Sequence, residues 1–326
     1  MMIIMLVSIL ISEVAVAFVL TLLITPYINR FLITRGYTSI DVHKNEPTEV
    51  PTFGGIAPVI AIFASLLIPI FFFDLLNILQ LIAILFTISL ITLIGIFDDL
   101  KTISQLQKTI FCAAASIPLY FVLHDTKLTL PFLGTLDIGW LFLILIAFTV
   151  VVSSNLTNML AGFNGLETGL GIITSAALAA ILTISGRVSF LTLLMPFTGA
   201  LIGFIFYNWY PSKTFPGDTL TLTIGTVLAC VALVSQLTFY LVILFIPYII
   251  DFLMKATVKF QGRKLYGDTK IRADGTLEPP KYPAVAHGLL KFTPMTEKQL
   301  VKALIIIETV FALIAISLAL LSFVFS

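Results

Sequence analysis

Long apolar runs dominate this sequence and limit the folds that it can adopt. A helix needs about 20 mostly apolar residues to cross a bilayer, and ten runs of about that length are present. They cover approximately residues 3–28, 54–73, 75–97, 108–123, 140–160, 166–185, 189–207, 219–236, 237–258 and 300–324. Charged residues make up only 11% of the chain, whereas a soluble domain has about 25%. We therefore predict an all-α polytopic membrane protein, a single integral membrane domain over residues 1–326 with about ten transmembrane helices.

The composition argues against several other classes of protein. A net charge of +1 gives no electrostatic reason to expect nucleic acid as a partner. Cys112 and Cys230 both lie in apolar runs, so we expect two buried thiols and no disulfide. With three histidines and no cysteine pair, a zinc site is not expected. The first apolar run is too long for a cleaved signal peptide and lacks a basic n-region.

The basic residues are divided unevenly between the two sides of the membrane that this topology defines. Of the 18 basic residues, only Lys127 and Arg187 lie in loops that follow even-numbered helices. The positive-inside rule then places the other loops in the cytoplasm and both termini outside. These predicted cytoplasmic loops, which hold most of the unusual polar residues, are about 29–53, 98–107, 158–166, 208–218 and 259–298. On the outer side, residues 126–139 contain a turn at Pro131 and Gly134, which predicts a small external β-hairpin.

Two adjacent carboxylates, Asp98 and Asp99, follow the third apolar run. Like charges side by side at the end of a membrane helix need a cation to neutralise them. A hard ion such as Mg²⁺ could supply that charge, and Lys108 would return close to the same place. Neighbouring side chains on a helix point about 100° apart, so we expect one carboxylate to face a substrate and the other to orient a lysine. We assign the substrate-facing role to Asp99; a solvated helix end is the alternative.

A polar segment lies between the fifth and sixth apolar runs. It contains Asn155, Asn158, Asn164 and Glu167, together with glycines that allow a sharp break in the chain. Asn155 and Asn158 are three residues apart and share one helix face. Amide carbonyls are suitable Mg²⁺ ligands, and an asparagine can also read the edge of a base through paired hydrogen bonds. Helix packing by small residues would explain the glycines but not the four polar side chains.

Two shorter motifs lie in other predicted cytoplasmic loops. Phe215 and Asp218 precede the eighth apolar run, where Asp218 is either a helix N-cap or a metal ligand, with Phe215 as a stacking platform. Asp41 and Lys44 precede a Gly54-Gly55 pair at the start of the second run. A basic residue and a glycine turn beside a helix N-terminus are suited to a phosphate, although such a loop is also common without a ligand.

The last predicted cytoplasmic loop, 259–298, is basic and rich in glycine and proline. Arg263 and Lys264 could clamp phosphates, and Asp274-Gly275 predicts a tight hairpin turn. His287 is the loop's single histidine and a candidate for substrate binding. A solvated, inside-positive loop is the alternative interpretation of the same residues.

In this order, the motifs resemble those of the polyprenyl-phosphate N-acetylhexosamine-1-phosphate transferases. This superfamily includes the eukaryotic UDP-GlcNAc:dolichyl-phosphate GlcNAc-1-phosphate transferase and the bacterial phospho-N-acetylmuramoyl-pentapeptide transferase. The resemblance runs from about Asp41 to Val301 and is carried by Asn158-Met-Leu-Ala-Gly-Phe-Asn-Gly-Leu-Glu167, Asp98-Asp99, Lys108 and Gly217-Asp218. It implies that the phosphate of a polyprenyl phosphate attacks the β-phosphate of a UDP-sugar, with Mg²⁺ or a substituting Mn²⁺ as cofactor, and that UMP leaves.

The resemblance also implies roles for individual residues. Asp218 and Asn158 would hold Mg²⁺ against the pyrophosphate. Asp98, Asp99 and Lys108 would lie beside the phosphates as catalytic residues. Phe215 and Asn164 would hold the uracil. The other residues assigned to substrate binding are Asn155, Glu167, Asp41, Lys44, Arg263, Lys264 and His287.

Two differences from the bacterial pentapeptide branch indicate which branch of the superfamily this chain resembles. Ala161 stands where the bacterial pentapeptide branch has an acid, and His287 is alone where that branch has a histidine cluster. The run Leu160–Glu167 is similar to the eukaryotic and archaeal GlcNAc branch, and the short last loop favours an archaeal protein. We therefore expect GlcNAc-1-phosphate transfer from UDP-GlcNAc to dolichyl phosphate, the first membrane step of glycan assembly such as N-glycosylation. The expected location is an archaeal plasma membrane, with the endoplasmic reticulum membrane as the alternative.

Other functions are compatible with parts of the sequence. The donor could be another UDP-sugar, such as UDP-GalNAc or UDP-MurNAc-pentapeptide, and the protein could act as a homodimer. A secondary transporter with ten helices would place its polar residues near the membrane midplane, often within internal repeats. Here the unusual residues gather at one face of the membrane, which favours the transferase. A structural membrane scaffold would not need clustered carboxylates and asparagines.

Overall fold

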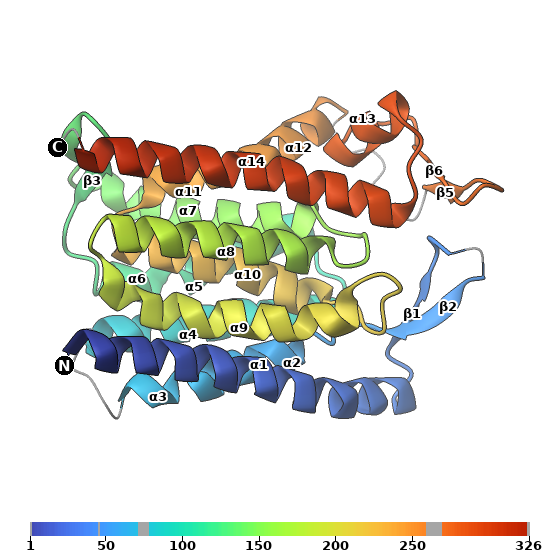
Figure 1. Ribbon diagram of the computed structural model, residues 1–326, viewed down its shortest axis with the longest axis horizontal. Helices are drawn as coiled ribbons and strands as arrows, with labels where there is room; N and C mark the ends of the chain where they lie inside the picture. The colour runs from blue at the N-terminus through green and yellow to red at the C-terminus, as the bar shows by residue number, and fades with distance from the viewer. Residues whose placement is uncertain (1, 45, 71–77, 259–268, 325–326) are drawn as a thin grey trace.

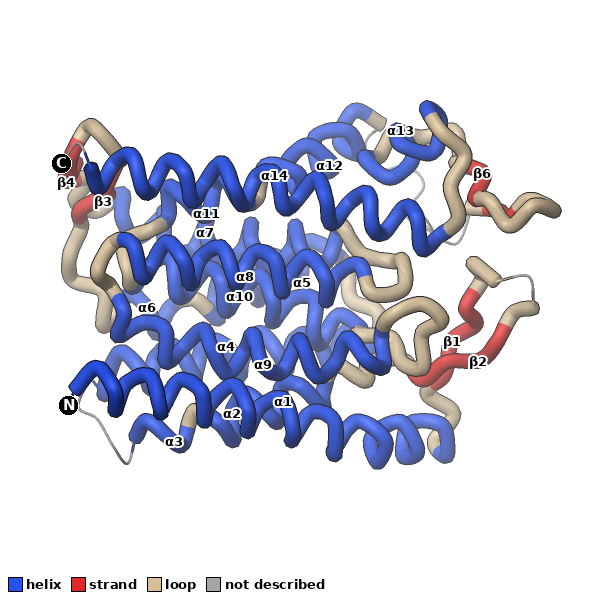
Figure 2. Tube along the Cα trace, in the orientation of Figure 1, coloured by secondary structure: helices blue, strands red, loops and turns tan. Residues whose placement is uncertain are grey.

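The computed structural model describes residues 2–44, 46–70, 78–258 and 269–324, which form a bundle of helices (Figures 1 and 2). The long helices are α1 (Met2–Thr34), α4 (Ile78–Leu100), α7 (Leu141–Met159), α8 (Leu166–Ile184), α9 (Leu191–Asn208), α10 (Gly217–Val234) and α14 (Glu297–Val324). The shorter helices are α2 (Ile56–Ser65), α3 (Leu67–Ile70), α5 (Gln105–Ala115), α6 (Ile117–Tyr120), α11 (Thr238–Leu244), α12 (Ile246–Thr257), α13 (Val285–Phe292) and the 3₁₀ helix η1 (Val188–Phe190).

The helix lengths confirm a polytopic membrane protein but not the predicted count of ten spans. Among the described residues, seven helices are long and apolar enough to cross a membrane, and α11 with α12 forms an eighth candidate that bends by 61°. The runs predicted at 54–73 and 108–123 fall instead on short broken helices, α2–α3 and α5–α6. The second break lies at Ser116, whose hydroxyl donates to the backbone of the preceding turn, and Pro118 follows in the first turn of α6.

The two ends of the bundle carry different elements. Both chain termini lie at the same end as β3, whereas β1, β2, β6 and α13 lie at the opposite end (Figures 1 and 2). The predicted external hairpin is thus separated from the predicted cytoplasmic loops by the length of the bundle. The boundary between the second and third predicted spans falls within 71–77, which lies outside the described residues.

Three antiparallel hairpins project from the bundle. They are β1 (Thr38–Asp41) with β2 (Thr48–Pro51), β3 (Lys127–Leu130) with β4 (Gly134–Asp137), and β5 (Lys270–Ile271) with β6 (Leu277–Glu278). The second is the hairpin predicted at 126–139. The third confirms the turn at Asp274-Gly275, where Gly275 has a φ of 80° that favours glycine. The first was not predicted; it is held to the helix bundle partly by Phe215 N–H, which donates to Pro51 O at 2.9 Å.

Helix α10 lies between α4 and α7. It is the most enclosed of the candidate spans, with 83% of its residues buried. Glycines allow its backbone to approach both neighbours closely. A Cβ atom on Gly225 would lie 2.1 Å from Ser153 O of α7, and one on Gly95 of α4 would lie 2.7 Å from Asp218 O. The start of α10 is therefore packed directly against the end of α4, where the adjacent carboxylates lie.

We expect Lys127 and Lys270 to lie on opposite sides of the membrane, because their hairpins lie at opposite ends of the bundle. In a background with Cys112→Ala and Cys230→Ala, single Lys127→Cys and Lys270→Cys variants should react with an impermeant maleimide from opposite faces of sealed, oriented vesicles. Both should react after permeabilisation, which serves as the control. Reaction of both cysteines from one face would contradict this topology.

Candidate active site

One cavity of about 1350 Å³ is lined by half of the predicted site residues, namely Asp41, Asn155, Asn158, Asn164, Glu167, Phe215 and Asp218. It is lined by β1, the turn between α7 and α8, the start of α10, and the bent pair α11–α12. Polar side chains line one part, among them Asp41, His43, Asn158, Asn164, Glu167 and Asp218. Apolar side chains of the membrane helices line the other part, among them Leu145, Phe148, Val152, Leu241, Phe245 and Leu253. The cavity is therefore suited to a ligand with a polar end and an apolar end.

The Lys108 ammonium lies between two carboxylates and pairs with both of them. Asp98 comes from the end of α4 and Asp218 from the first turn of α10, whereas Lys108 comes from the first turn of α5. The side chains of Lys108 and Asp98 are buried, and that of Asp218 keeps 27% of its surface exposed. Buried charges need partners, and one lysine leaves the two carboxylates with excess negative charge. The Asp218 side of this cluster, which lines the cavity, would therefore attract a further cation.

Asp99 has a different role from Asp98. Its Oδ1 accepts a hydrogen bond from the backbone N–H of Asp218 at 2.8 Å, and its Oδ2 accepts from the N–H and hydroxyl of Thr219 at 2.9 and 2.6 Å. The first N–H groups of a helix lack intrahelical partners, so Asp99 caps α10 from the neighbouring helix. The capping role considered for Asp218 thus belongs to Asp99. This geometry also argues against our expectation that Asp99 faces a substrate, because both its oxygens are directed at α10.

Asn158 completes the polar wall beside Asp218. Its Nδ2 donates to Asp218 Oδ2 at 3.0 Å, and its Oδ1 accepts from the Thr221 hydroxyl at 3.0 Å. Carboxylate and amide oxygens are the ligands that Mg²⁺ prefers. A half-turn of the Asn158 amide would direct its oxygen toward Asp218. The donor set therefore fits a hard divalent cation at this wall.

In a second group of polar residues that line the cavity, Asp41 fixes the side chain of Asn164. Asp41 Oδ2 accepts from Asn164 Nδ2 at 2.8 Å and pairs with Lys44 Nζ at 2.7 Å. The backbone N–H of Asn164 donates to Glu297 Oε1 of α14 at 2.7 Å. Two segments that are distant in sequence from Asn164, residues 41–44 and α14, thereby hold this asparagine, whose amide orientation is set by the Asp41 carboxylate.

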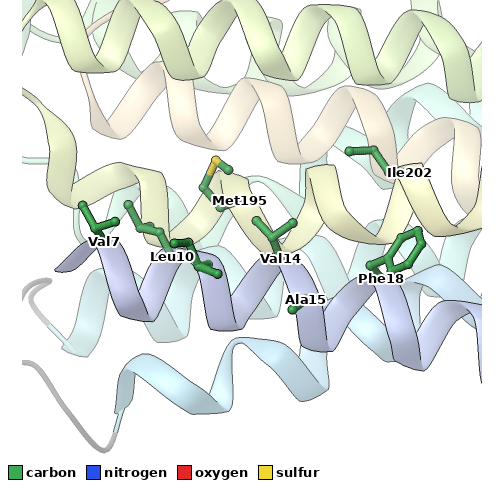
Figure 3. Close-up of a pocket in the computed structure, with 8 residues that line it drawn as sticks. Val7, Leu10, Val14, Ala15, Phe18, Met195 and Ile202 are labelled. Atoms are coloured by element: carbon green, nitrogen blue, oxygen red, sulfur yellow. The ribbon is translucent and has the colours of Figure 1, made fainter. Parts of the chain in front are cut away.

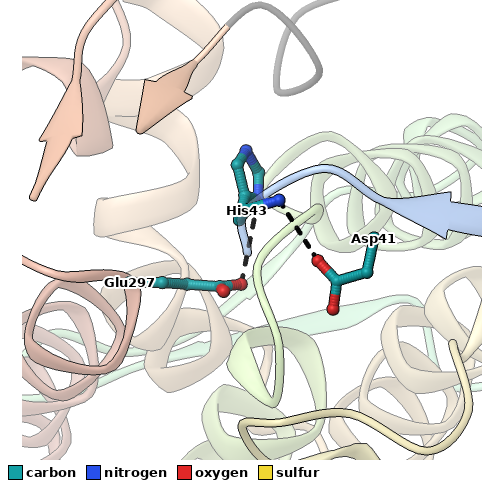
Figure 4. Close-up of side chains that lie close together, drawn as sticks. All are labelled: Asp41, His43 and Glu297. Atoms are coloured by element: carbon teal, nitrogen blue, oxygen red, sulfur yellow. Dashed lines mark hydrogen bonds and ion pairs between the residues drawn. The ribbon is translucent and has the colours of Figure 1, made fainter. Parts of the chain in front are cut away.

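Asp41, His43 and Glu297 also form a buried group whose residue types could ligate a metal (Figure 4). Their ligand atoms lie within 4.8 Å of one another, and His43 Nδ1 is 3.8 Å from Glu297 Oε1. However, Asp41 and Glu297 already accept hydrogen bonds from Asn164, and the His43 ring stacks on Phe163 with centroids 5.0 Å apart. We therefore interpret this group as a clamp on the α7–α8 turn and not as a metal centre.

The remaining predicted residues near the cavity are held by local hydrogen bonds. Glu167 Oε1 accepts from the backbone N–H of Gly162 at 2.5 Å and so closes the turn between α7 and α8. Asn155 donates to a carbonyl of its own helix at 2.8 Å and lines the cavity. Phe215 also lines it, and its backbone oxygen accepts from Gly54 N–H at 2.9 Å. Strand β2 and the start of α2 are thus attached to the loop before α10.

The structure does not bring every predicted residue to the cavity. Arg263 and Lys264 lie outside the described residues. His287 is buried in α13, with Nδ1 3.1 Å from Tyr282 O, and is not among the residues that line the cavity. Burial lowers the pKa of the His287 imidazole, which favours its neutral form at pH 7. A cationic contact between His287 and a phosphate therefore has no support in this arrangement.

Two residues of the site were missed by the sequence analysis. Lys255 of α12 is buried and lines the cavity, whereas the sequence analysis counted it only among the basic residues of the predicted cytoplasmic side. Asp251 precedes it by four residues in the same apolar run, and this acid–base spacing was the available signal. Glu297 had no local signal, because its contact with Asn164 joins residues 133 positions apart.

A second pocket lies between α1 and α9 and is unsuited to ionic chemistry (Figure 3). Its side chains are all apolar: Val7, Leu10, Ile11, Val14, Ala15, Phe18, Met195 and Ile202. It therefore offers neither the charge nor the hydrogen-bonding groups found in the larger cavity.

The cap on α10 generates a prediction about stability. Asp99→Ala should lower the thermal midpoint by the equivalent of about 1–3 kcal/mol, because the N–H groups of Asp218 and Thr219 would lose their acceptor in a buried place. Thermal unfolding in detergent would measure this loss. Glu278→Ala, which removes an exposed acid of β6, is the control and should leave the midpoint nearly unchanged. Equal midpoints for the two variants would contradict the capping role.

Comparisons with known proteins cover most of the chain. A model of glycosyl transferase family 4 matches residues 81–236. The chain is 34% identical over 323 residues to a Sulfolobus acidocaldarius protein provisionally named UDP-N-acetylglucosamine–dolichyl-phosphate N-acetylglucosaminephosphotransferase, covering 96% of this chain and 97% of the relative. It is 26% identical over 295 residues to the protein of that name from Schizosaccharomyces pombe, covering 75% and 66%. It is 29% identical over 290 residues to the phospho-N-acetylmuramoyl-pentapeptide-transferase of Listeria innocua, covering 80% and 88%.

Proposed function

Because the chain belongs to glycosyl transferase family 4, we propose that it transfers N-acetylglucosamine-1-phosphate from UDP-N-acetylglucosamine to a dolichyl-type polyprenyl phosphate. An oxygen of the lipid phosphate attacks the β-phosphorus of the nucleotide sugar, the bond to the α-phosphate breaks, and UMP leaves. The product is a lipid-linked diphosphate sugar. The names of the archaeal and fission yeast relatives support this choice of substrates.

The single observation that carries the proposal is that one cavity combines an ionic wall with an apolar wall. Phe148 of α7, Val242 of α11 and Leu253 of α12 line it and are each more than half exposed on candidate membrane helices. Apolar side chains exposed at that depth can contact lipid chains directly. A polyprenyl chain would therefore lie along α7 and α11–α12, with its phosphate toward Asn158 and Asp218.

The polar wall suits phosphoryl transfer, which needs mainly positioning and neutralisation of charge. Lys108 pairs with Asp98 and Asp218 and leaves a net negative charge at Asp218, and Asp99 fixes the backbone that carries Asp218. A Mg²⁺ ion held by Asp218 and Asn158 would neutralise the pyrophosphate and polarise the β-phosphorus. We assign Asp98 to holding Lys108 against Asp218, and Asp99 to positioning the start of α10.

The group of residues around Asn164 suits the nucleotide. Asn164 donates its Nδ2 to Asp41, so its Oδ1 points the other way and can accept a hydrogen bond. Uracil presents an imide N–H where cytosine presents a lone pair, so an oriented oxygen distinguishes the two bases. Phe215, on the same cavity, would stack on the base.

The uneven distribution of basic residues favours a cytoplasmic active site, and the archaeal relative favours the plasma membrane of an archaeon. A second donor remains a candidate because of the similarity to the Listeria innocua pentapeptide transferase. Purified protein incubated with Mg²⁺, polyprenyl phosphate and a panel of UDP-sugars would test the donor. UMP release with UDP-GlcNAc alone is the expected result, and release with UDP-MurNAc-pentapeptide instead would favour the second candidate.

We expect transfer of the sugar phosphate to require a divalent cation, and we expect the Asp218→Ala substitution to abolish this transfer. The carboxylate is the charged group at the proposed metal wall, and loss of one such group lowers turnover by about 10² or more. Steady-state UMP release with and without chelator would measure both effects, and thermal unfolding would show that the variant is folded. Asp137→Ala at the opposite end of the bundle is the control. Undiminished turnover by the Asp218 variant would remove this residue from the site.

Base selection gives an independent prediction. In Asp41→Asn, the new amide could donate as well as accept, so the orientation of Asn164 would no longer be fixed. We expect KM for UDP-GlcNAc to rise about tenfold and the preference over CDP-GlcNAc to fall, with little change in kcat. Glu49→Gln in β2, an exposed position of the same hairpin, is the matched control. An unchanged preference between the two nucleotides would contradict the role of Asp41.

A further inference from the structure

Lys255 is a buried lysine whose contacts join the two parts of the cavity. It is 1% exposed and is the one lysine or arginine among the described residues that line the cavity. Its Nζ lies 2.5 Å from Asp251 Oδ2, one turn earlier in α12, and donates to Met159 O at 2.6 Å. Met159 is the last residue of α7 and the neighbour of Asn158.

The contact with Met159 stabilises the end of α7. The last carbonyls of a helix have no intrahelical donor, and Leu160 leaves the helix with φ −90° and ψ 52°. A lysine at this end supplies both a donor and a favourable charge for the helix dipole. Lys255 therefore fixes the last turn of α7, which carries Asn158.

The Lys255–Asp251 ion pair lies in α12, which lines the apolar part of the cavity, and it also contacts α13. Helix α12 bends by 61° from α11 and contributes Ile249, Phe252 and Leu253 to the cavity. Asp251 is fully buried, and its Oδ1 accepts from the backbone N–H of Val285, at the start of α13, at 3.0 Å. The pair thus connects the end of α7, the apolar wall and α13.

We propose that Lys255 is a positioning residue that holds α12 against the last turn of α7, so that a lipid chain along α12 delivers its phosphate beside Asn158. The delivery of a lipid phosphate to Asn158 rests on the proposed function, whereas the contact between α12 and α7 does not. Binding energy from a remote part of a substrate raises turnover only when it is used to orient the reacting group. A rigid connection between the apolar wall and the ionic wall provides that orientation.

The first test measures the geometry and needs no activity. Lys255→Met alone would leave Asp251 buried without its cation, so the test variant combines Asp251→Asn with Lys255→Met. Spin labels at Phe148→Cys and Leu253→Cys, both exposed, would report the distance between α7 and α12 in a background with Cys112→Ala and Cys230→Ala. We expect a narrow distance distribution with the native pair and a broad or shifted one in the double variant.

Lys291→Met, which removes an exposed lysine of α13, is the matched control and should leave the distribution unchanged. An unchanged distribution in the double variant would overturn the proposal, whatever the activity of the protein.

The second test uses polyprenyl phosphates with a long and a short chain. In the double variant, the fall in kcat should be about 10–100-fold larger with the long lipid than with the short lipid, because release of the last turn of α7 affects both lipids, whereas movement of α12 affects only the long one. Equal losses with both lipids would indicate a direct contact with the phosphate and overturn the positioning role. If the unmodified protein transfers no sugar phosphate, the proposed function fails, and the spin-label distances still decide the role of Lys255.

Discussion

The pairing of Lys108 with Asp98 and Asp218 is the interaction on which the arrangement of the site depends. Three helices that are separate in sequence, α4, α5 and α10, bring their charged ends to one place in an otherwise apolar bundle. None of these charges is tolerable there alone, because an unpaired buried charge is strongly destabilising. Asp99 and Gly95 then set how closely α4 and α10 approach, through the cap on α10 and the missing side chain.

Around this cluster, the cavity is built from two walls with different chemistry. The membrane helices provide the apolar wall, and helix ends together with loops at one end of the bundle provide the polar wall. The Asp41 clamp holds the α7–α8 turn from one side, and Lys255 holds the end of α7 from the other. Both substrates of the proposed reaction are anionic at the reacting end, while only one has an apolar chain, so a two-part cavity of this kind suits them.

The membrane helices and two of the hairpins were predictable because residues that are close together in the sequence specify them. Long apolar runs specify membrane helices regardless of their neighbours, and the hairpins at 126–139 and Asp274-Gly275 follow from turn residues beside alternating strands. The polar residues Asn158 and Asp218 were identifiable because polar side chains are expensive in such a chain. The number of spans was less predictable, because two apolar runs form short broken helices, one of them interrupted at Ser116 and Pro118.

The sequence by itself determined that this chain crosses the membrane several times and that its carboxylates and asparagines gather in the loops of one face. Only the tertiary structure decided what each of them does. Adjacent in sequence, Asp98 and Asp99 differ because one meets a lysine and the other meets the start of α10. Glu297 and Lys255 gained their roles from contacts with residues 133 and 96 positions away. Such roles depend on which helix ends meet in space, and no local pattern of residues encodes that meeting.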